Sequence, residues 1–220
     1  MDGAAAAGCL DVVRWLHQNR MEGCSTRAVD QAAAGGHLHV VKWLLEHRSE
    51  KCTSAAMDGA AANGHLNVVQ WLHDNTDATC TTKAMDRAAA VGRLDIVKWL
   101  HKYRHEGCTS AAMDQAAGHG ALDVVRWLHS NRAGGCTEEA MNAASANGHL
   151  KIVKWLQAHR SEQNADLVLS AAARFEHFDV FLFLHAQCGA KCSEDIALAT
   201  RDPGADDVDV DPISLSRHSR

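Results

Sequence analysis

Apolar and small side chains recur along the chain at a fixed interval of 28 residues. The same interval separates all the tryptophans, one leucine column that ends in a phenylalanine, and one glycine column. These three columns are Trp15, Trp43, Trp71, Trp99, Trp127 and Trp155; Leu10, Leu38, Leu66, Leu94, Leu122, Leu150 and Phe178; and Gly8, Gly36, Gly64, Gly92, Gly120 and Gly148. Several independent columns with one period indicate a chain built from repeated structural units.

One unit, residues 52–79, predicts two short helices. Thr53 is a suitable N-cap, because its hydroxyl can accept a hydrogen bond from an otherwise unpaired helix N–H. The alanine-rich segment 54–62 then predicts a first helix, and Gly64 stands where a left-handed residue would end it. Apolar residues at helical spacing predict a second helix from 66 to about 74. Helices of about three turns are unstable alone in water, so each unit must bury its apolar face against the next, as in a solenoid.

Residues 60–72 resemble the centre of an ankyrin repeat. They read Ala-Ala-Ala-Asn-Gly-His-Leu-Asn-Val-Val-Gln-Trp-Leu, and the resemblance extends from residue 1 to about 191. It implies an all-α fold, a right-handed solenoid of stacked helix-turn-helix units. The chain departs from the family pattern in its period, 28 residues instead of about 33, and in residues 55–58, which replace the family's Thr-Pro-Leu-His helix start. We therefore expect shortened or absent β-hairpins.

The columns also predict the limits of the units. The first unit lacks the first turn of its first helix, a degenerate eighth repeat spans 192–204, and we expect the acidic and serine-rich tail, 205–220, to be disordered. The predicted units of the array, which spans 1–191, are 1–23, 24–51, 52–79, 80–107, 108–135, 136–163 and 164–191.

The two ends of the array differ. End units of a solenoid usually carry a polar outer face. The seventh unit holds all four phenylalanines and is interpreted as a partial cap, whereas the first unit reads like an interior one. Its outer face would expose alanine, leucine and valine. We therefore expect either further repeats upstream or end-to-end self-association through this uncapped repeat.

Composition and charge exclude several classes of function. With 22 Lys+Arg and 27 Asp+Glu the net charge is −5, which leaves no basic footprint for nucleic acid. No run of 18 apolar residues predicts a membrane span, and no signal peptide is visible, so a cytoplasmic or nuclear location is expected. The absence of a phosphate-binding loop, nucleophile elbow or kinase signature argues against an enzyme, and no cofactor is expected.

The tryptophan and cysteine columns are interpreted as structural. The tryptophans could form an aromatic binding ladder, but we expect them mainly to fill the space between units. The column Cys24, Cys52, Cys80, Cys108 and Cys136 could suggest disulfides or metal. Equivalent residues in adjacent units should lie about 8–10 Å apart, and a disulfide needs Cα atoms within about 7 Å. Small buried side chains are therefore expected, without a metal site.

Four polar columns also favour structural roles. Two histidine columns, at the start and the end of the second helix, are interpreted as structural rather than as a metal or pH sensor. Acidic residues recur in the first helix, where hydrogen bonding between units and a helix-dipole effect are expected, and arginines recur near the end of the second, where the dipole favours cations. The acidic column is Asp2, Asp30, Asp58, Asp86 and Asp114; the arginine column is Arg20, Arg48, Arg104, Arg132 and Arg160.

Positions that change from unit to unit while staying polar or large are the natural place for partner specificity. In the ankyrin-like arrangement the first helices line the concave face. The candidate partner-binding residues there are Arg27, Gln31, Lys83, Arg87, Gln115 and Glu139, with the loop residues Lys51, Tyr103 and His105 as a second group. The sequence thus predicts a non-enzymatic protein–protein interaction module, an adaptor or scaffold that binds a protein on its concave face. The alternative is a structural fragment of a longer array whose activity resides in other domains or in upstream repeats.

Overall fold

The computed structural model describes residues 1–21, 23–132, 134–159 and 165–188. These residues form fourteen α-helices and no β-strand, which confirms the predicted all-α fold. The predicted eighth repeat, 192–204, and the predicted disordered tail, 205–220, lie outside the described residues.

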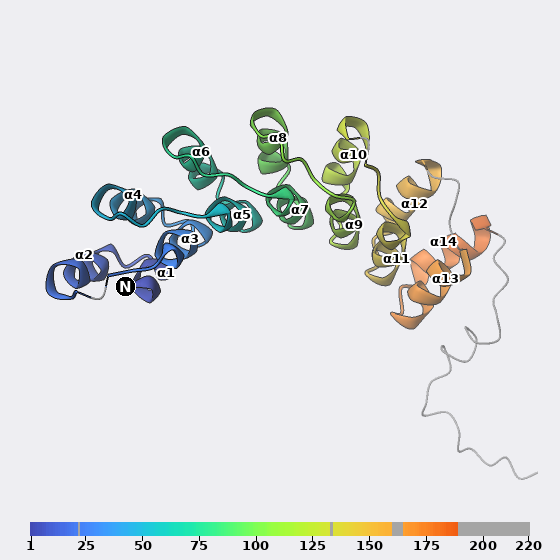
Figure 1. Ribbon diagram of the computed structural model, residues 1–220. Coiled ribbons are helices and arrows are strands. Elements are labelled where there is room, and N and C mark those ends of the chain that lie inside the picture. The colour runs from blue at the N-terminus through green and yellow to red at the C-terminus, as the bar shows by residue number, and fades with distance from the viewer. Residues whose placement is uncertain (22, 133, 160–164, 189–220) are drawn as a thin grey trace, which may run out of the picture.

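The helices alternate between two rows (Figure 1). The first helices of the units are α1 (Asp2–Ala6), α3 (Thr26–Ala34), α5 (Ser54–Ala62), α7 (Thr82–Ala90), α9 (Ala111–Gly118), α11 (Glu138–Ala146) and α13 (Ala165–Arg174). The second helices are α2 (Leu10–Asn19), α4 (Leu38–His47), α6 (Leu66–Asn75), α8 (Leu94–Tyr103), α10 (Leu122–Asn131), α12 (Leu150–His159) and α14 (Phe178–Cys188). First helices pack directly on one another, whereas second helices spread apart, so the array forms an arch with the first helices on its concave side.

Side-chain size explains this curvature. The first helices meet through alanine and glycine: a Cβ placed on Gly59 would lie only 2.8 Å from the Cβ of Ala34 in the preceding unit. The second helices instead carry larger apolar residues, of which Leu72, Leu100 and Leu128 are fully buried. Small residues let the inner helices approach closely and larger residues hold the outer ones apart, which bends the stack.

The predicted caps form. The Thr53 hydroxyl accepts a hydrogen bond from the Ala55 backbone N–H at 3.1 Å, and the following helix covers 54–62 as expected. The second helix of this unit ends at Asn75, one residue later than predicted. The start of α9 differs, because this helix begins after Ser110. The Thr109 hydroxyl still accepts a hydrogen bond, from the Ala111 backbone N–H.

The turn between the two helices of a unit requires glycine for two reasons. Gly36 has a φ of 76°, a left-handed conformation that costs a residue with a Cβ about 1 kcal/mol or more. A Cβ there would also lie 2.5 Å from the His65 ring, which covers the turn from the following unit. The histidines before the second helices are therefore packing residues, as interpreted from the sequence.

Where the structure describes them, the connections between units are short and contain no strand. Residues 48–53, 76–81 and 104–109 link each second helix to the next first helix in extended or bent conformations. Shortened or absent β-hairpins were predicted from the 28-residue period, and these connections confirm it.

Candidate protein-binding surface

A carboxylate in each of the five first helices from α1 to α9 joins that helix to the next unit. The Asp58 Oδ1 atom accepts from the Thr81 backbone N–H at 2.8 Å, and its Oδ2 atom accepts from the Thr81 hydroxyl at 2.7 Å. The carboxylate also lies at the N-terminus of the following first helix, where the dipole favours negative charge. The predicted hydrogen bonding between units is confirmed, with the same pair of bonds at Asp2–Ser25, Asp30–Thr53, Asp86–Thr109 and Asp114–Thr137.

The tryptophan rings lie between units, in contact with histidines. His73 at the end of α6 meets Trp99 of the next unit edge-on, with ring centroids 5.2 Å apart and planes at 86°. The same contact recurs at His17–Trp43, His101–Trp127 and His129–Trp155. Trp43 is buried and the following tryptophans are partly buried. The structure therefore supports a packing role for the rings in contact with a neighbour.

Arginines at the ends of the second helices form a second link between units. The Arg104 Nη1 atom lies 3.4 Å from the His73 Nδ1 atom, and its Nη2 atom lies 2.6 Å from the Glu106 Oε1 atom. Burial alone would raise the pKa of Glu106, but hydrogen bonds from Arg104 and from the backbone outweigh it and lower the pKa to about 2. Arg104 is the C-cap residue of α8 and has an extended backbone. Its guanidinium contacts the His73 and Glu106 side chains, and the helix dipole favours a cation at the same place.

The expectation of uniformly buried cysteines is only partly correct. Cys80 and Cys136 are buried, whereas Cys24, Cys52 and Cys108 are half-buried. The whole column lies in the linkers at the edge of the stack, where burial differs from unit to unit. Burial raises the pKa of the Cys80 thiol to about 11, with Glu106 as a smaller cause. None of these five cysteines is disulfide-bonded in the described part of the chain.

The structure places the predicted partner-binding residues of the first helices along one row. Arg27 lies on α3, Lys83 and Arg87 on α7, Gln115 on α9 and Glu139 on α11. These five side chains are exposed, and Gln31, also on α3, is half-buried. All six are carried by the first helices, the row that forms the concave side of the arch (Figure 1).

Tyr103 does not belong to this group. It was expected in a loop, but it is the last residue of α8, where it packs on Trp99 with ring centroids 5.0 Å apart. All the second helices from α2 to α12 have ten residues and end at this same position of the repeat, so Tyr103 completes a regular helix. The structure therefore separates Tyr103 from the first-helix residues, while Lys51 and His105 do lie in exposed linker positions.

The outer face of the first unit is exposed. Val12 and Trp15 keep 48% and 55% of their surface accessible, whereas the equivalent Val40 and Trp43 are buried. The expected apolar surface at this end is present, with tryptophan contributing to it as well as the aliphatic residues.

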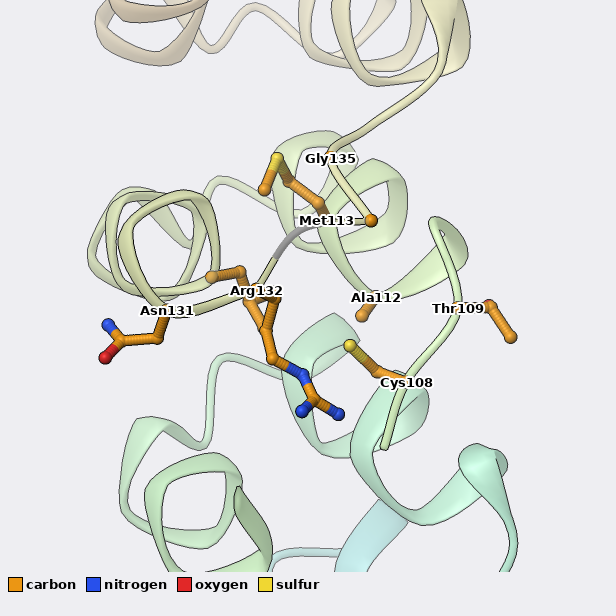
Figure 2. Close-up of a pocket in the computed structure, with 9 residues that line it drawn as sticks. Cys108, Thr109, Ala112, Met113, Asn131, Arg132 and Gly135 are labelled. Carbon is orange, nitrogen blue, oxygen red and sulfur yellow. The ribbon is translucent and has the colours of Figure 1, made fainter. Parts of the chain in front are cut away.

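A small cavity was not foreseen from the sequence. It measures about 200 Å³ and lies between the linker of residues 108–109 and the end of α10, with Arg132 beside it (Figure 2). The signal that could have revealed it is Gly134, which stands where other units have Glu50 or Glu106. No group of three or more His, Cys, Asp or Glu side chains suited to a metal ion gathers within the described part of the chain.

Comparison with known proteins gives the repeat a family. A family model described as ankyrin repeats in many copies matches residues 1–45 and 108–157, and one described as ankyrin repeats in three copies matches 29–111. The chain belongs to the ankyrin repeat family. The predicted resemblance is thereby confirmed, and the two matches together extend over residues 1–157.

A solved structure agrees on the fold. The crystal structure of the human ASB11 ankyrin repeat domain superposes with a TM-score of 0.61 at 18% identity, covering 83% of this chain and 96% of that one. No curated protein matches the chain. Ankyrin repeats generally serve as protein–protein interaction modules and are typically non-enzymatic. None of the helices in the described residues has the length and hydropathy needed to cross a membrane.

Proposed function

We propose that this ankyrin repeat chain is a non-enzymatic adaptor or scaffold that binds a protein partner along its concave face. One observation carries the proposal: the exposed positions of the first helices change from unit to unit, while the contacts between units repeat. Across successive units one such position holds arginine, alanine, lysine, alanine and glutamate, at Arg27, Ala55, Lys83, Ala111 and Glu139.

The repeated contacts supply a rigid support for these variable side chains. The first helices from α3 to α11 are each held at the N-terminus by the aspartate of the preceding unit, and their buried faces consist mainly of alanine. The exposed residues are therefore presented at a regular spacing, with side chains that differ in charge and length. Charged and polar groups on a preorganised surface provide partner specificity.

The test is affinity capture from a cytosolic extract of the native organism, followed by protein identification. A variant with Gln31→Ala, Lys83→Ala, Arg87→Glu and Gln115→Ala should lose at least ten-fold of the captured partner, because it removes four polar contacts and reverses one charge. These side chains are exposed or half-buried, so the fold should persist.

A matched control carries Lys98→Ala and Arg126→Glu on the second helices, where both residues are exposed. It changes the net charge by the same amount but leaves the concave face intact, so it should capture the partner as wild type does. A partner retained equally by all three proteins would refute the proposed surface and favour a role as part of a longer array.

We also propose that the exposed end of the first unit mediates end-to-end self-association. Two copies could meet about a two-fold axis and bury Val12 and Trp15 of both, an isologous contact. Sedimentation equilibrium should then show a concentration-dependent dimer that Trp15→Glu abolishes. A monomer at several hundred micromolar, on the order of the highest useful concentration, would exclude this contact.

A further inference from the structure

Arg132 occupies a position that in two other units is completed by a carboxylate. We propose that the cavity beside Arg132 binds the carboxylate of an aspartate or glutamate side chain from a protein partner. The proposal rests on the proposed function only in taking a protein as the source of this carboxylate.

In two units, the arginine forms an ion pair with the glutamate two residues later. Arg48 contacts Glu50 at 2.8 Å, with each side chain 22% exposed, and Arg104 contacts Glu106 at 2.6 Å. These ion pairs lie in the linker, two residues apart, and they lower the pKa of both glutamates. A carboxylate is therefore the natural partner of a guanidinium at this place in the stack.

The unit of residues 52–79 lacks both members of the pair. Thr76 replaces the arginine, and its hydroxyl donates to the Leu72 carbonyl oxygen at 2.6 Å. Ala78 replaces the glutamate and is buried. With the cation absent, this position of the unit needs no counter-ion.

The unit of residues 108–135 keeps the arginine without the glutamate. The Arg132 Nη1 atom lies 3.5 Å from the His101 Nδ1 atom, which matches the distances of Arg48 to His17 and Arg104 to His73, 3.5 and 3.4 Å. The Arg132 Nη2 atom also occupies the space that a Cβ on Gly107 would need, just as the Arg48 Nη2 atom does at Gly23. The guanidinium thus holds the same place, yet Gly134 stands where the glutamate would be, and no carboxylate of the described residues forms an ion pair with Arg132.

Space for the missing carboxylate is present. Cys108, Thr109, Asn131, Arg132, Gly134 and Gly135 are among the residues that line the cavity of about 200 Å³. Figure 2 shows the Arg132 side chain extending from the end of α10 toward Cys108. A Cβ built on Gly134 would meet nothing within 4 Å, so this side of the cavity is open.

The chemistry of the lining selects a carboxylate. A guanidinium offers a planar fork of N–H donors that fits both oxygens of a carboxylate, and charge-assisted bonds of this type are about twice as strong as neutral ones. The Thr109 residue borders the same cavity, directly before the first helix α9 that carries Gln115. A partner on the concave face could therefore reach Arg132 with one acidic side chain.

The test uses the purified full chain and a defined probe, the peptide acetyl-Gly-Glu-Gly-amide. Its binding is followed by NMR through the arginine Nε–H signals, with Arg132 assigned by the loss of one signal in Arg132→Lys. The Arg132 signal should shift saturably, with a Kd on the order of millimolar, while the signal of Arg104 stays in place. The matched peptide acetyl-Gly-Gln-Gly-amide, at equal ionic strength, should give no saturable shift.

Two variants test the identity of the site. Gly134→Glu should supply the carboxylate from within the chain and abolish the response to the peptide. Gly134→Ala, which cannot reach the guanidinium, should leave the response unchanged. Equal shifts at Arg132 and Arg104, equal binding of both peptides, or a response that persists in Gly134→Glu would overturn the proposal.

The two proposals fail separately. The peptide titration needs no natural partner, so its failure would remove the carboxylate site and leave the capture experiment on the concave face untouched. Conversely, a partner retained by the concave-face variant would remove that surface without affecting a saturable shift of the Arg132 signal.

Discussion

Replacing Leu100 by alanine is expected to lower the free energy of unfolding by about 2–5 kcal/mol. Leu100 is 1% exposed in α8, near the middle of the array, between the apolar faces of both helices of its unit. The substitution removes buried methyl groups and leaves a cavity that the close-packed stack can fill only partly. Because each unit is stabilised by its neighbours, a weakened central unit also reduces the coupling between the two halves of the array.

Urea denaturation followed by circular dichroism measures this effect. The matched control is Lys98→Ala, which changes an exposed residue of the same helix and should shift the free energy of unfolding by less than about 0.5 kcal/mol. A broadened or two-step transition in Leu100→Ala would agree with uncoupled halves. A change as small as that of the control would contradict the placement of Leu100 in the core.

The second large effect is expected at Asp86, which joins two units. Its carboxylate accepts from the Thr109 backbone N–H at 2.8 Å and from the Thr109 hydroxyl at 2.9 Å, and the residue is buried. Asp86→Ala removes both bonds and leaves the Thr109 backbone N–H without its acceptor. Hydrogen bonds to charged groups contribute about 1.5–3 kcal/mol each, so a total loss of about 3–6 kcal/mol is expected.

Two further variants separate the bonding from the charge. Asp86→Asn keeps one oxygen acceptor and should lose less than Asp86→Ala. Asp95→Asn removes the exposed ion pair with Arg93, 3.0 Å long, and should cost less than about 1 kcal/mol. Hydrogen exchange of the Thr109 amide should accelerate in Asp86→Ala alone. Equal destabilisation by Asp86→Ala and Asp95→Asn would contradict the structural role of Asp86.

Much of the scaffold could be predicted from the sequence because each unit repeats the same local signals. The cap at Thr53, the left-handed Gly64 and the first helix, 54–62, depend on interactions within a few residues. The bonds of the aspartates to the next unit could be anticipated because the acidic residue and the capping residue recur with the same period. A repeated sequence reports on neighbouring units as well as on itself.

The remaining features depend on three-dimensional placement. Half-buried Cys108 and buried Cys80 share a column, so periodicity alone cannot separate them. Tyr103 was assigned to a loop because the second helices were expected to end one residue earlier in the repeat, whereas all those from α2 to α12 extend to this position. The importance of Gly134 becomes visible only when Arg132 is seen in the same place as Arg48, facing a position without a carboxylate.

Photo-crosslinking tests the central claim, that the concave face binds a protein, most directly. The photoreactive residue p-benzoylphenylalanine would replace Arg87 on α7 in one sample and Lys98 on α8 in another, since both positions are exposed on the same unit but on opposite sides of it. After irradiation in cytosolic extract, the account predicts a discrete protein adduct from position 87 and none from position 98. An adduct formed from position 98 and not from position 87 would contradict it.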